Sequence, residues 1–297
     1  MVYKSLTESY RFYNLRTNFK YYGRERMTRI IAFANQKGGV GKTTTCINVS
    51  TYAALMGKKV LTIDIDPQGN CSTGLGVEKS TLKASVYTVM SGESEVKSSI
   101  IKTCVKNLDI LPSNIDLAGA EVELVSVDDR EKVLKNVINT LRNDYDFIFI
   151  DCPPSLGLLT VNALAAADSI LIPIQGEFFA LEGLSQLLNT IKLAKKILNP
   201  SLDIEGVILT MYDGRSKLVQ SVGEEIQKFF GRKVYTTRIP RNVRLGEAPS
   251  YGLPIALYEP RSMGSLAYKS LTEEFFIRNR VEYEKIADVS ALKVKMK

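Results

Sequence analysis

Histidine is absent from the 297 residues of this sequence. Its absence excludes serine–histidine–aspartate triads, histidine general bases and histidine metal ligands, so any chemistry must use carboxylates, lysines, hydroxyls and backbone amides. Long apolar runs are also missing: no stretch reaches the roughly 18 to 20 uninterrupted apolar residues of a membrane span, and the N-terminus has no apolar signal core. We therefore expect no membrane insertion.

Cysteine is scarce. The four cysteines are widely spaced, without a C-x-x-C pair, so the sequence indicates neither a zinc site nor a redox dithiol. Free thiols of this kind are typical of a reducing compartment, which predicts a cytoplasmic location. The four are Cys46, Cys71, Cys104 and Cys152.

The composition is that of a globular protein with an excess of positive charge. Hydrophobic residues make up 45% and charged residues 24% of the sequence, which is enough apolar material for a sizeable core. The net charge of +7 favours attraction to polyanions, either nucleic acid or an anionic membrane surface. Charge alone does not choose between these two partners, and it is also compatible with a basic surface that has no function.

A glycine-rich segment, Asn35–Thr45, directly follows the apolar run Ile30–Ala34. A buried strand, a glycine-rich turn and then a helix are the architecture of a phosphate-binding loop. We expect Gly38, Gly39 and Gly41 to take positive φ and to let backbone amides approach an anion closely.

Two side chains of this segment have the positions that phosphate chemistry requires. Lys42 would reach the β and γ phosphates of a nucleotide, and Thr43 would place its hydroxyl on Mg²⁺. The segment departs from the common pattern G-x-x-x-x-G-K-[ST], because Gln36 replaces the first glycine and Lys37 follows it. The loop thus carries a second lysine at its mouth.

Carboxylates end two further apolar stretches. Lys59–Asp66 is a predicted strand that runs into Asp64 and Asp66, and Asp146–Asp151 is a predicted strand closed by Asp151. In open α/β sheets the carboxyl ends of the strands are where ligands bind. The second stretch has the form of a Walker B element, in which Asp151 holds Mg²⁺ directly or through water.

Apolar strands alternate with helical patterns along the chain, which predicts βα units. We expect an α/β fold of the P-loop NTPase type, with a doubly wound, mostly parallel sheet and helices on both faces. Residues 72–107 read as irregular. The further predicted strands are Leu108–Leu111, Ser169–Ile174 and Ile204–Met211, and the predicted helices are Cys46–Met56, Leu117–Arg142, Leu181–Leu198 and a closing helix over Leu266–Lys297 with Leu266, Leu271, Phe275 and Phe276 inward.

Residues 1–26 differ from the rest because basic and aromatic residues alternate there. Such a mixture suits stacking on bases or contact with an anionic partner. It is equally consistent with a flexible tail or with sequence upstream of the natural start, since Met27 stands directly before the first strand. We predict an arm over 1–26 and a single domain over 27–297.

Four motifs resemble those of a known family. Lys37–Thr44 resembles the deviant Walker A loop of the ParA/MinD class of P-loop ATPases; Asp64–Asn70 and Asp151–Gly157 resemble its switch I and switch II. Ile239–Gly252, within a basic segment, resembles a stretch found in Soj-type ParA proteins.

The resemblance implies an ATPase that uses ATP and Mg²⁺ and forms a homodimer when ATP binds, with slow hydrolysis that a partner stimulates. Asp66 would position the attacking water, and Lys37 would complete the partner's site. The implied nucleotide-binding residues are Lys37, Gly38, Gly39, Val40, Gly41, Lys42, Thr43, Thr44, Pro240 and Asn242; the implied DNA-binding residues are Arg215 and Arg244.

Three functions are compatible with these motifs. The first is a Soj/ParA-type partitioning ATPase that binds double-stranded DNA nonspecifically, associates with the nucleoid and responds to a ParB-type partner. The second is a MinD-like ATPase on a membrane surface, although the C-terminal residues are only weakly amphipathic. The third is a metabolic or cluster-carrying relative, against which Cys104 and Cys152 argue because they lack glycine-flanked settings.

Overall fold

The computed structural model describes residues 28–286. The predicted N-terminal arm, residues 1–26, lies outside the described residues, as does the C-terminal stretch 287–297. The division into an arm and one domain therefore stays a prediction. No helix within 28–286 combines the length and hydrophobicity of a membrane span.

A seven-stranded sheet with the order β3-β4-β2-β5-β1-β6-β7 forms the centre of the fold. All neighbouring strands are parallel except β3 and β4, which pair antiparallel at one edge. The predicted α/β fold with a mostly parallel sheet is confirmed. The strands are β1 (Arg29–Phe33), β2 (Val60–Asp64), β3 (Ile101–Lys102), β4 (Leu108–Leu111), β5 (Phe147–Asp151), β6 (Ser169–Gln175) and β7 (Asp203–Thr210).

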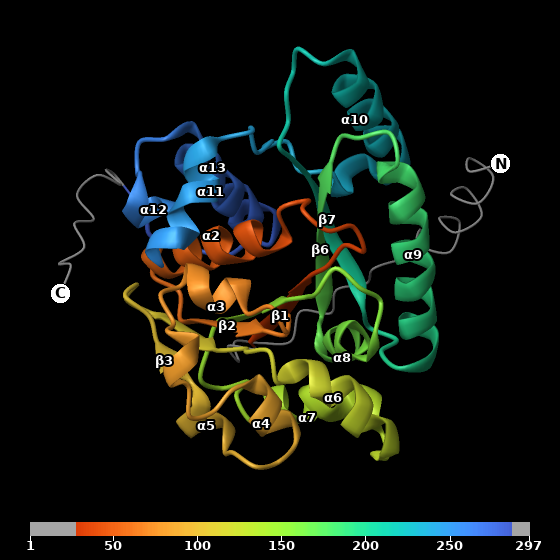
Figure 1. Ribbon diagram of the computed structural model, residues 1–297. Coiled ribbons are helices and arrows are strands. Elements are labelled where there is room, and N and C mark those ends of the chain that lie inside the picture. Colours follow the sequence, from red (N-terminus) through yellow and green to blue (C-terminus); the bar gives the residue numbers. More distant parts are fainter. Residues whose placement is uncertain (1–27, 287–297) are drawn as a thin grey trace.

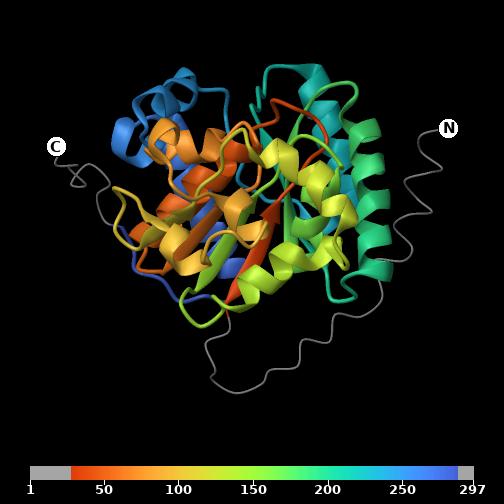
Figure 2. The same cartoon turned by 60° about the horizontal axis from the view of Figure 1, so that its bottom comes forward.

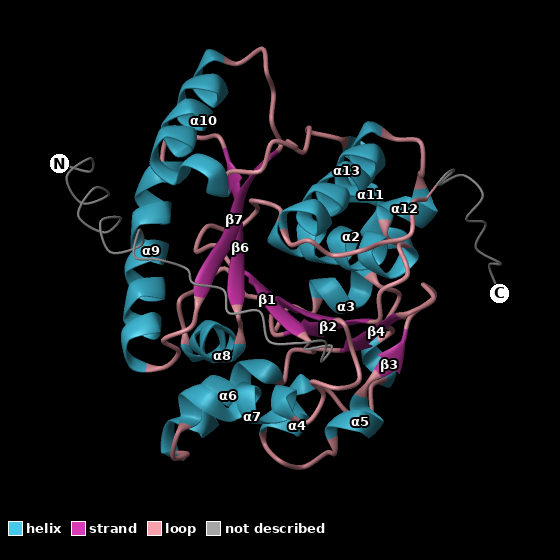
Figure 3. Ribbon diagram, turned by 180° about the vertical axis from the view of Figure 1, so that it is seen from behind, coloured by secondary structure: helices cyan, strands magenta, loops and turns pink. Residues whose placement is uncertain are grey.

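Helices cover both faces of this sheet (Figure 1). Figures 2 and 3 show the same two layers after rotation, with the strands between them. The helices are α2 (Lys42–Leu55), α3 (Asn70–Gly74), α4 (Val86–Met90), α5 (Val96–Ser99), α6 (Leu117–Glu123), α7 (Val133–Asn139), α8 (Leu158–Ala166), α9 (Ala180–Ile197), α10 (Lys217–Phe230), α11 (Val243–Glu247), α12 (Ile255–Tyr258) and α13 (Met263–Arg278). Short 3₁₀ turns are η1 (Lys79–Thr81), η2 (Leu124–Ser126), η3 (Arg130–Lys132), η4 (Gly231–Lys233) and η5 (Ala248–Tyr251).

Successive side chains of each strand point to opposite faces of the sheet, so the hydrophobic core consists of two clusters, one on each face. In β1, Ile30 and Ala32 belong to the cluster that α7, α8, α9 and α10 cover, whereas Ile31 and Phe33 belong to the cluster under α2 and α13. Successive side chains of a strand point to opposite faces, so a strand with helices on both sides must be apolar throughout. That requirement explains why the strands could be recognised as continuous apolar runs.

The predicted helix over Leu117–Arg142 is wrong as a single element. The chain forms α6, η2, η3 and α7 instead, and the break falls where Val127 is extended and Asp129 adopts φ 54°. Asn162 of α8 accepts a hydrogen bond from the Leu134 amide and donates one to the Arg130 carbonyl. A residue distant in sequence thus supplies the start of α7, which apolar spacing alone cannot reveal.

Two other expectations about regular structure are also wrong. Residues 72–107 are not simply irregular, because they contain most of α3, then η1, α4, α5 and β3. These elements are two to five residues long, too short for a periodic pattern to develop. The closing helix ends at Arg278, and Leu266 is exposed on it, while Leu271, Phe275 and Phe276 are buried as expected.

The strand register places acidic side chains together. Asp64 of β2 lies opposite Asp151 of β5, and Asp151 lies opposite Phe33 at the end of β1. Because the loop after β1 leads into α2, the glycine-rich segment and both carboxylates meet at one edge of the sheet. The fold therefore assembles the predicted site from three neighbouring strands.

Gly206 is a position at which β7 packs closely against the segment that follows α10. Gly206 lies in β7, where a Cβ atom would come within 2.7 Å of the Lys233 carbonyl oxygen and would also strike the Tyr235 ring. We expect Gly206→Ala to lower the free energy of unfolding by about 1–3 kcal/mol, because backbone must shift to accommodate it. Chemical denaturation measures this change.

Gly183 provides a matched control within α9. A Cβ atom there meets nothing within 4 Å. Alanine stabilises a helix relative to glycine by about 0.5–1 kcal/mol. Gly183→Ala should therefore raise the unfolding midpoint slightly. Equal destabilisation by both substitutions would show that the close approach at Gly206 is not the cause.

Candidate functional site

The loop between β1 and α2 has the conformation expected for a phosphate cradle, with one exception. Gly39 and Gly41 adopt φ values of 73° and 85°, a region that favours glycine. Gly38 does not adopt a positive φ, so that part of the prediction is wrong. A Cβ atom at Gly38 would make only an ordinary contact, 3.9 Å from the Pro154 Cβ atom.

Side chains from distant strands and helices hold this loop. The Asn35 amide donates to the Pro173 carbonyl at 2.7 Å and accepts from the Lys37 amide at 3.0 Å. Thr210, at the end of β7, donates to the Val40 carbonyl at 2.7 Å. These hydrogen bonds hold the loop in one conformation, and a preorganised loop has less conformational entropy to lose when it binds an anion.

Lys42 points back into the loop. Its ammonium donates to the Lys37 carbonyl at 3.0 Å, and the side chain is buried. Burial lowers the pKa of Lys42, and the charges of Asp151, Cys152 and Asp66 oppose this shift. A buried ammonium group is well placed to bind a phosphate and to neutralise its negative charge.

Asp64 and Asp66 are buried together at the end of β2. Asp64 accepts hydrogen bonds from the Ser72 amide at 2.8 Å, the Ser72 hydroxyl at 2.7 Å and the Asp66 amide at 3.1 Å. Burial raises the pKa of Asp64 to about 6 despite these bonds. Among residues 28–286, the Asp66 carboxylate accepts one hydrogen bond, from the Gln68 amide at 2.9 Å, and its second oxygen accepts none there.

Asp151 differs from both because neither of its carboxylate oxygens has a hydrogen-bond partner among residues 28–286, although both are buried. Burial raises its pKa well above the usual range, and the charges of Asp64 and Asp66 add to this shift. The Thr43 hydroxyl is near enough to lower the pKa but does not complete a hydrogen bond of ordinary geometry. A buried carboxylate without a donor is strained electrostatically unless a proton or a cation neutralises it.

The residues around Asp151 fit Mg²⁺ that is shared with a ligand. Oxygen atoms are the donors that Mg²⁺ prefers, and Asp151 and Thr43 supply them here. No group of three or more histidine, cysteine, aspartate or glutamate side chains within 28–286 could hold a metal by itself. Phosphate oxygens and water would have to complete the coordination, which is the usual arrangement for Mg²⁺ at nucleotides.

Lys37 lies at the mouth of the loop and forms an ion pair with Glu177, which follows β6. The Lys37 and Glu177 side chains are 37% and 44% exposed. An ion pair with this exposure contributes at most about 1 kcal/mol, so a phosphate group could displace Glu177. Phe178 and Phe179 expose their rings directly beside this pair.

A pocket of about 460 Å³ adjoins the loop and fits the base and sugar of a nucleotide in size. Pro240 and Asn242 line it together with Gly41, Thr44 and Thr210. The Asn242 side chain accepts a hydrogen bond from the Arg244 amide at 3.0 Å and so caps α11. The structure thus brings the predicted adenine-framing residues to the phosphate cradle.

Arg215 and Arg244 lie outside this pocket and face solvent. The Arg215 side chain is 91% exposed and pairs with Asp213 at 2.9 Å. Arg244 pairs with Glu247 at 2.7 Å. Each guanidinium is therefore accessible to a polyanion, but each already has a carboxylate neighbour that such a partner would replace.

Sequence reasoning missed three residues of the site. Glu177 follows β6 and Thr210 ends β7, at the same edge of the sheet as the loop, and only that position could have suggested them. The role of Asp64 as a buried acceptor that orders the loop after β2 could have been suspected from its spacing of two residues from Asp66.

Comparison with known proteins agrees with this geometry. A family model described as an AAA domain matches residues 28–204. A solved structure of cobyrinic acid a,c-diamide synthase from Mycobacterium smegmatis, with bound ATP analog and magnesium, has a TM-score of 0.76 and 34% sequence identity; the match covers 88% of this chain and 99% of that one.

Two curated relatives are more similar in sequence. The chain is 56% identical over 248 residues to the sporulation initiation inhibitor protein Soj of Bacillus subtilis (strain 168), a match that covers 84% of this chain and 98% of that protein. It is 49% identical over 261 residues to the chromosome partitioning protein ParA of Caulobacter vibrioides (strain NA1000 / CB15N), with 87% and 98% covered. The chain thus belongs to the family of Soj and ParA chromosome-partitioning proteins.

Proposed function

We propose that this protein is an ATPase of chromosome or plasmid partitioning, which dimerises when it binds ATP and Mg²⁺ and then binds DNA without sequence preference. The observation that carries the proposal is the buried, unpartnered Asp151 carboxylate beside Lys42, at the open end of a glycine cradle. This charge arrangement is balanced when a metal ion and phosphates are present. The related proteins named above support the biological role.

The residues of the chain divide the work of hydrolysis between them. Lys42 holds the phosphates, and Thr43 and Asp151 are the oxygen donors for Mg²⁺, which would neutralise phosphate charge. Asp66 has a free carboxylate oxygen with which to orient an attacking water. With no histidine in the chain, a carboxylate is the side chain best suited to that role.

Lys37 gives the reason for dimerisation. Lys42 already extends into the loop, whereas Lys37 lies at its mouth, where Glu177 neutralises it in the single chain. In the dimer Lys37 would leave Glu177 and lie along the phosphates of the partner subunit, where it stabilises the charge of the transition state. The exposed rings of Phe178 and Phe179 add apolar surface that a second subunit would cover.

DNA binding follows from exposed arginines and from the net charge of +7. Arg215 and Arg244 would contact phosphates and read no bases, which gives salt-sensitive binding at any sequence. The protein would then coat the nucleoid in its ATP form, and a ParB-type partner would stimulate hydrolysis and release it. A DNA titration with ATP, ADP and no nucleotide tests this cycle, and tight binding that is indifferent to nucleotide and salt contradicts it.

The first prediction concerns the water-positioning carboxylate. We expect Asp66→Ala to lose hydrolysis by a factor of about 10²–10⁴, the usual contribution of a positioned acid or base, while dimerisation and DNA binding with ATP persist. Phosphate release and DNA affinity are measured side by side. Normal hydrolysis by Asp66→Ala would remove this role from Asp66.

The second prediction separates the two loop lysines. Lys37→Ala should still bind nucleotide but fail to dimerise or to hydrolyse ATP, because its partner site lacks a cation. Glu177→Gln is the control: it removes the ion-pair partner and leaves the Lys37 ammonium, so its ATP-dependent dimerisation should equal or exceed that of the wild type. Sedimentation with ATP distinguishes them, and a dimeric, active Lys37→Ala protein would contradict the proposed role.

The third prediction concerns DNA. Arg215→Ala should dimerise normally but bind DNA more weakly. The slope of log K against log salt should become less steep by about 0.9, the contribution of one phosphate contact. Lys132, an exposed lysine of η3 that also pairs with an aspartate, provides a charge-matched control. If Lys132→Ala weakens binding as much as Arg215→Ala, net charge and not the position of Arg215 is responsible.

A further inference from the structure

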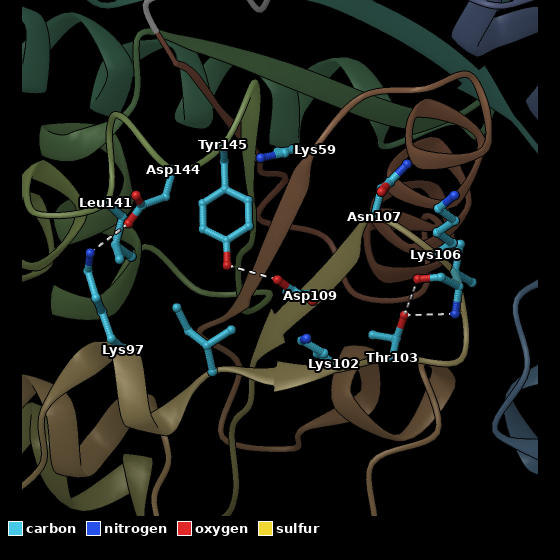
Figure 4. Close-up of a pocket in the computed structure, with 12 residues that line it drawn as sticks. Lys59, Lys97, Lys102, Thr103, Lys106, Asn107, Asp109, Leu141, Asp144 and Tyr145 are labelled. Carbon is cyan, nitrogen blue, oxygen red and sulfur yellow. Dashed lines mark hydrogen bonds and ion pairs between the residues drawn. The ribbon is translucent and has the colours of Figure 1, made fainter.

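A second polar pocket, of about 600 Å³, lies at the opposite end of the strands from the phosphate cradle (Figure 4). Lys59 directly precedes β2, Asn107 directly precedes β4, and Tyr145 stands two positions before the first residue of β5. The cradle is formed where β1, β2 and β5 end. Since β2 is five residues long, the two sites are separated by roughly 16 Å of strand and have no lining residue in common.

The walls of this pocket are held by defined contacts. The Thr103 hydroxyl donates to the Leu108 carbonyl at 2.8 Å and accepts from the Val105 amide at 3.1 Å, which closes the turn between β3 and β4. In the centre, the Tyr145 hydroxyl donates to Asp109 at 3.0 Å. The pocket is thus a built feature of the edge of the sheet.

Its charges are unbalanced. Four lysines line the pocket against two aspartates, a surplus of two positive charges. Lys97 pairs with Asp144 at 3.0 Å on one side, as Figure 4 shows, and Asp109 accepts from Tyr145. Within residues 28–286, no ion pair or hydrogen bond involves the ammonium groups of the three remaining lysines, Lys59, Lys102 and Lys106.

The pairing of β3 with β4 and the turn between them place two of these lysines on the pocket wall. The antiparallel pairing of β3 with β4 sets Lys102 opposite Asp109, and the tight turn that follows carries Lys106 and Asn107. The Asn107 backbone adopts φ 66°, a conformation that asparagine tolerates better than most residues. An anion that enters the pocket would therefore meet positive charge from the start of β2, from β3 and from the turn between β3 and β4.

We propose that this pocket binds a small ligand with two or more phosphate groups. The positive charge comes from three lysines at different places on the pocket wall, so a ligand with several phosphate groups can pair with more of them than one carboxylate or one phosphate monoester can. Buried Leu141 and Val105 give the pocket an apolar floor, and its volume is that of a nucleotide-sized ligand site. A DNA duplex presents its phosphates on a convex surface, which a concave pocket of this size does not match.

Inorganic tripolyphosphate is the probe for the test. The Lys42→Ala protein serves as background, so that the cradle does not mask binding elsewhere, and calorimetry measures the affinity. The double variant Lys102→Ala/Lys106→Ala should bind tripolyphosphate more than about tenfold more weakly, because it loses two charge-assisted contacts. Lys59→Gln alone should give a smaller loss, and added salt should weaken binding of the parent protein.

The control removes two exposed lysines outside the pocket, Lys196 in α9 and Lys285, and should leave the affinity unchanged. A short DNA duplex titrated into the same proteins distinguishes a nucleic-acid surface from a small-molecule site. No tripolyphosphate binding, an equal loss in the control, or a loss of duplex binding alone would each overturn the proposal. None of these results bears on the cradle, because the background already lacks Lys42.

Discussion

The burial of three carboxylates beside one lysine is the constraint on which the site depends. Asp64, Asp66 and Asp151 cluster where β2 and β5 end, and the buried Lys42 ammonium interacts with the charges of Asp66 and Asp151. Buried charges of one sign are costly unless hydrogen bonds or counter-charges compensate them. Asp64 has its compensation in Ser72, whereas Asp151 has none from the described protein, so the site is complete only with a cation and an anion together.

The parallel sheet produces this cluster and also tolerates it. Strands that are apolar on both faces must end in turns at the same edge, and polar side chains that follow them are gathered there without interrupting the core. Helix α2 adds its amide groups at that edge, and α13 fixes α2 through the hydrogen-bond contact between Thr45 and Tyr268 at 3.0 Å. Rigid packing on both faces therefore keeps the carboxylates close despite their mutual repulsion.

How much the sequence predicts depends on the range of the interactions involved. Six of the seven sheet strands, the glycine-rich loop and the position of Asp151 at a strand end were predictable because each is encoded within about ten consecutive residues, as apolar runs followed by glycines or carboxylates; β3, two residues long, was not. The break between α6 and α7 was not, since Asn162 from another helix supplies the hydrogen bonds that start α7. The Lys37–Glu177 pair joins residues 140 positions apart and leaves no local pattern, so only the folded chain reveals it.

The fold distributes the net charge of +7 over basic side chains in two different settings. Arg215 and Arg244 are exposed but each has an acidic neighbour, so their interaction with a polyanion replaces one ion pair by another and stays reversible and salt-sensitive. Lys59, Lys102 and Lys106 line a concave pocket, and their ammonium groups form no ion pair within residues 28–286, so an anion there would add interactions without displacing a carboxylate. These two opposite arrangements suit the two proposed roles, a surface that releases DNA on each cycle and a pocket that retains a small ligand. Composition alone could not have distinguished them.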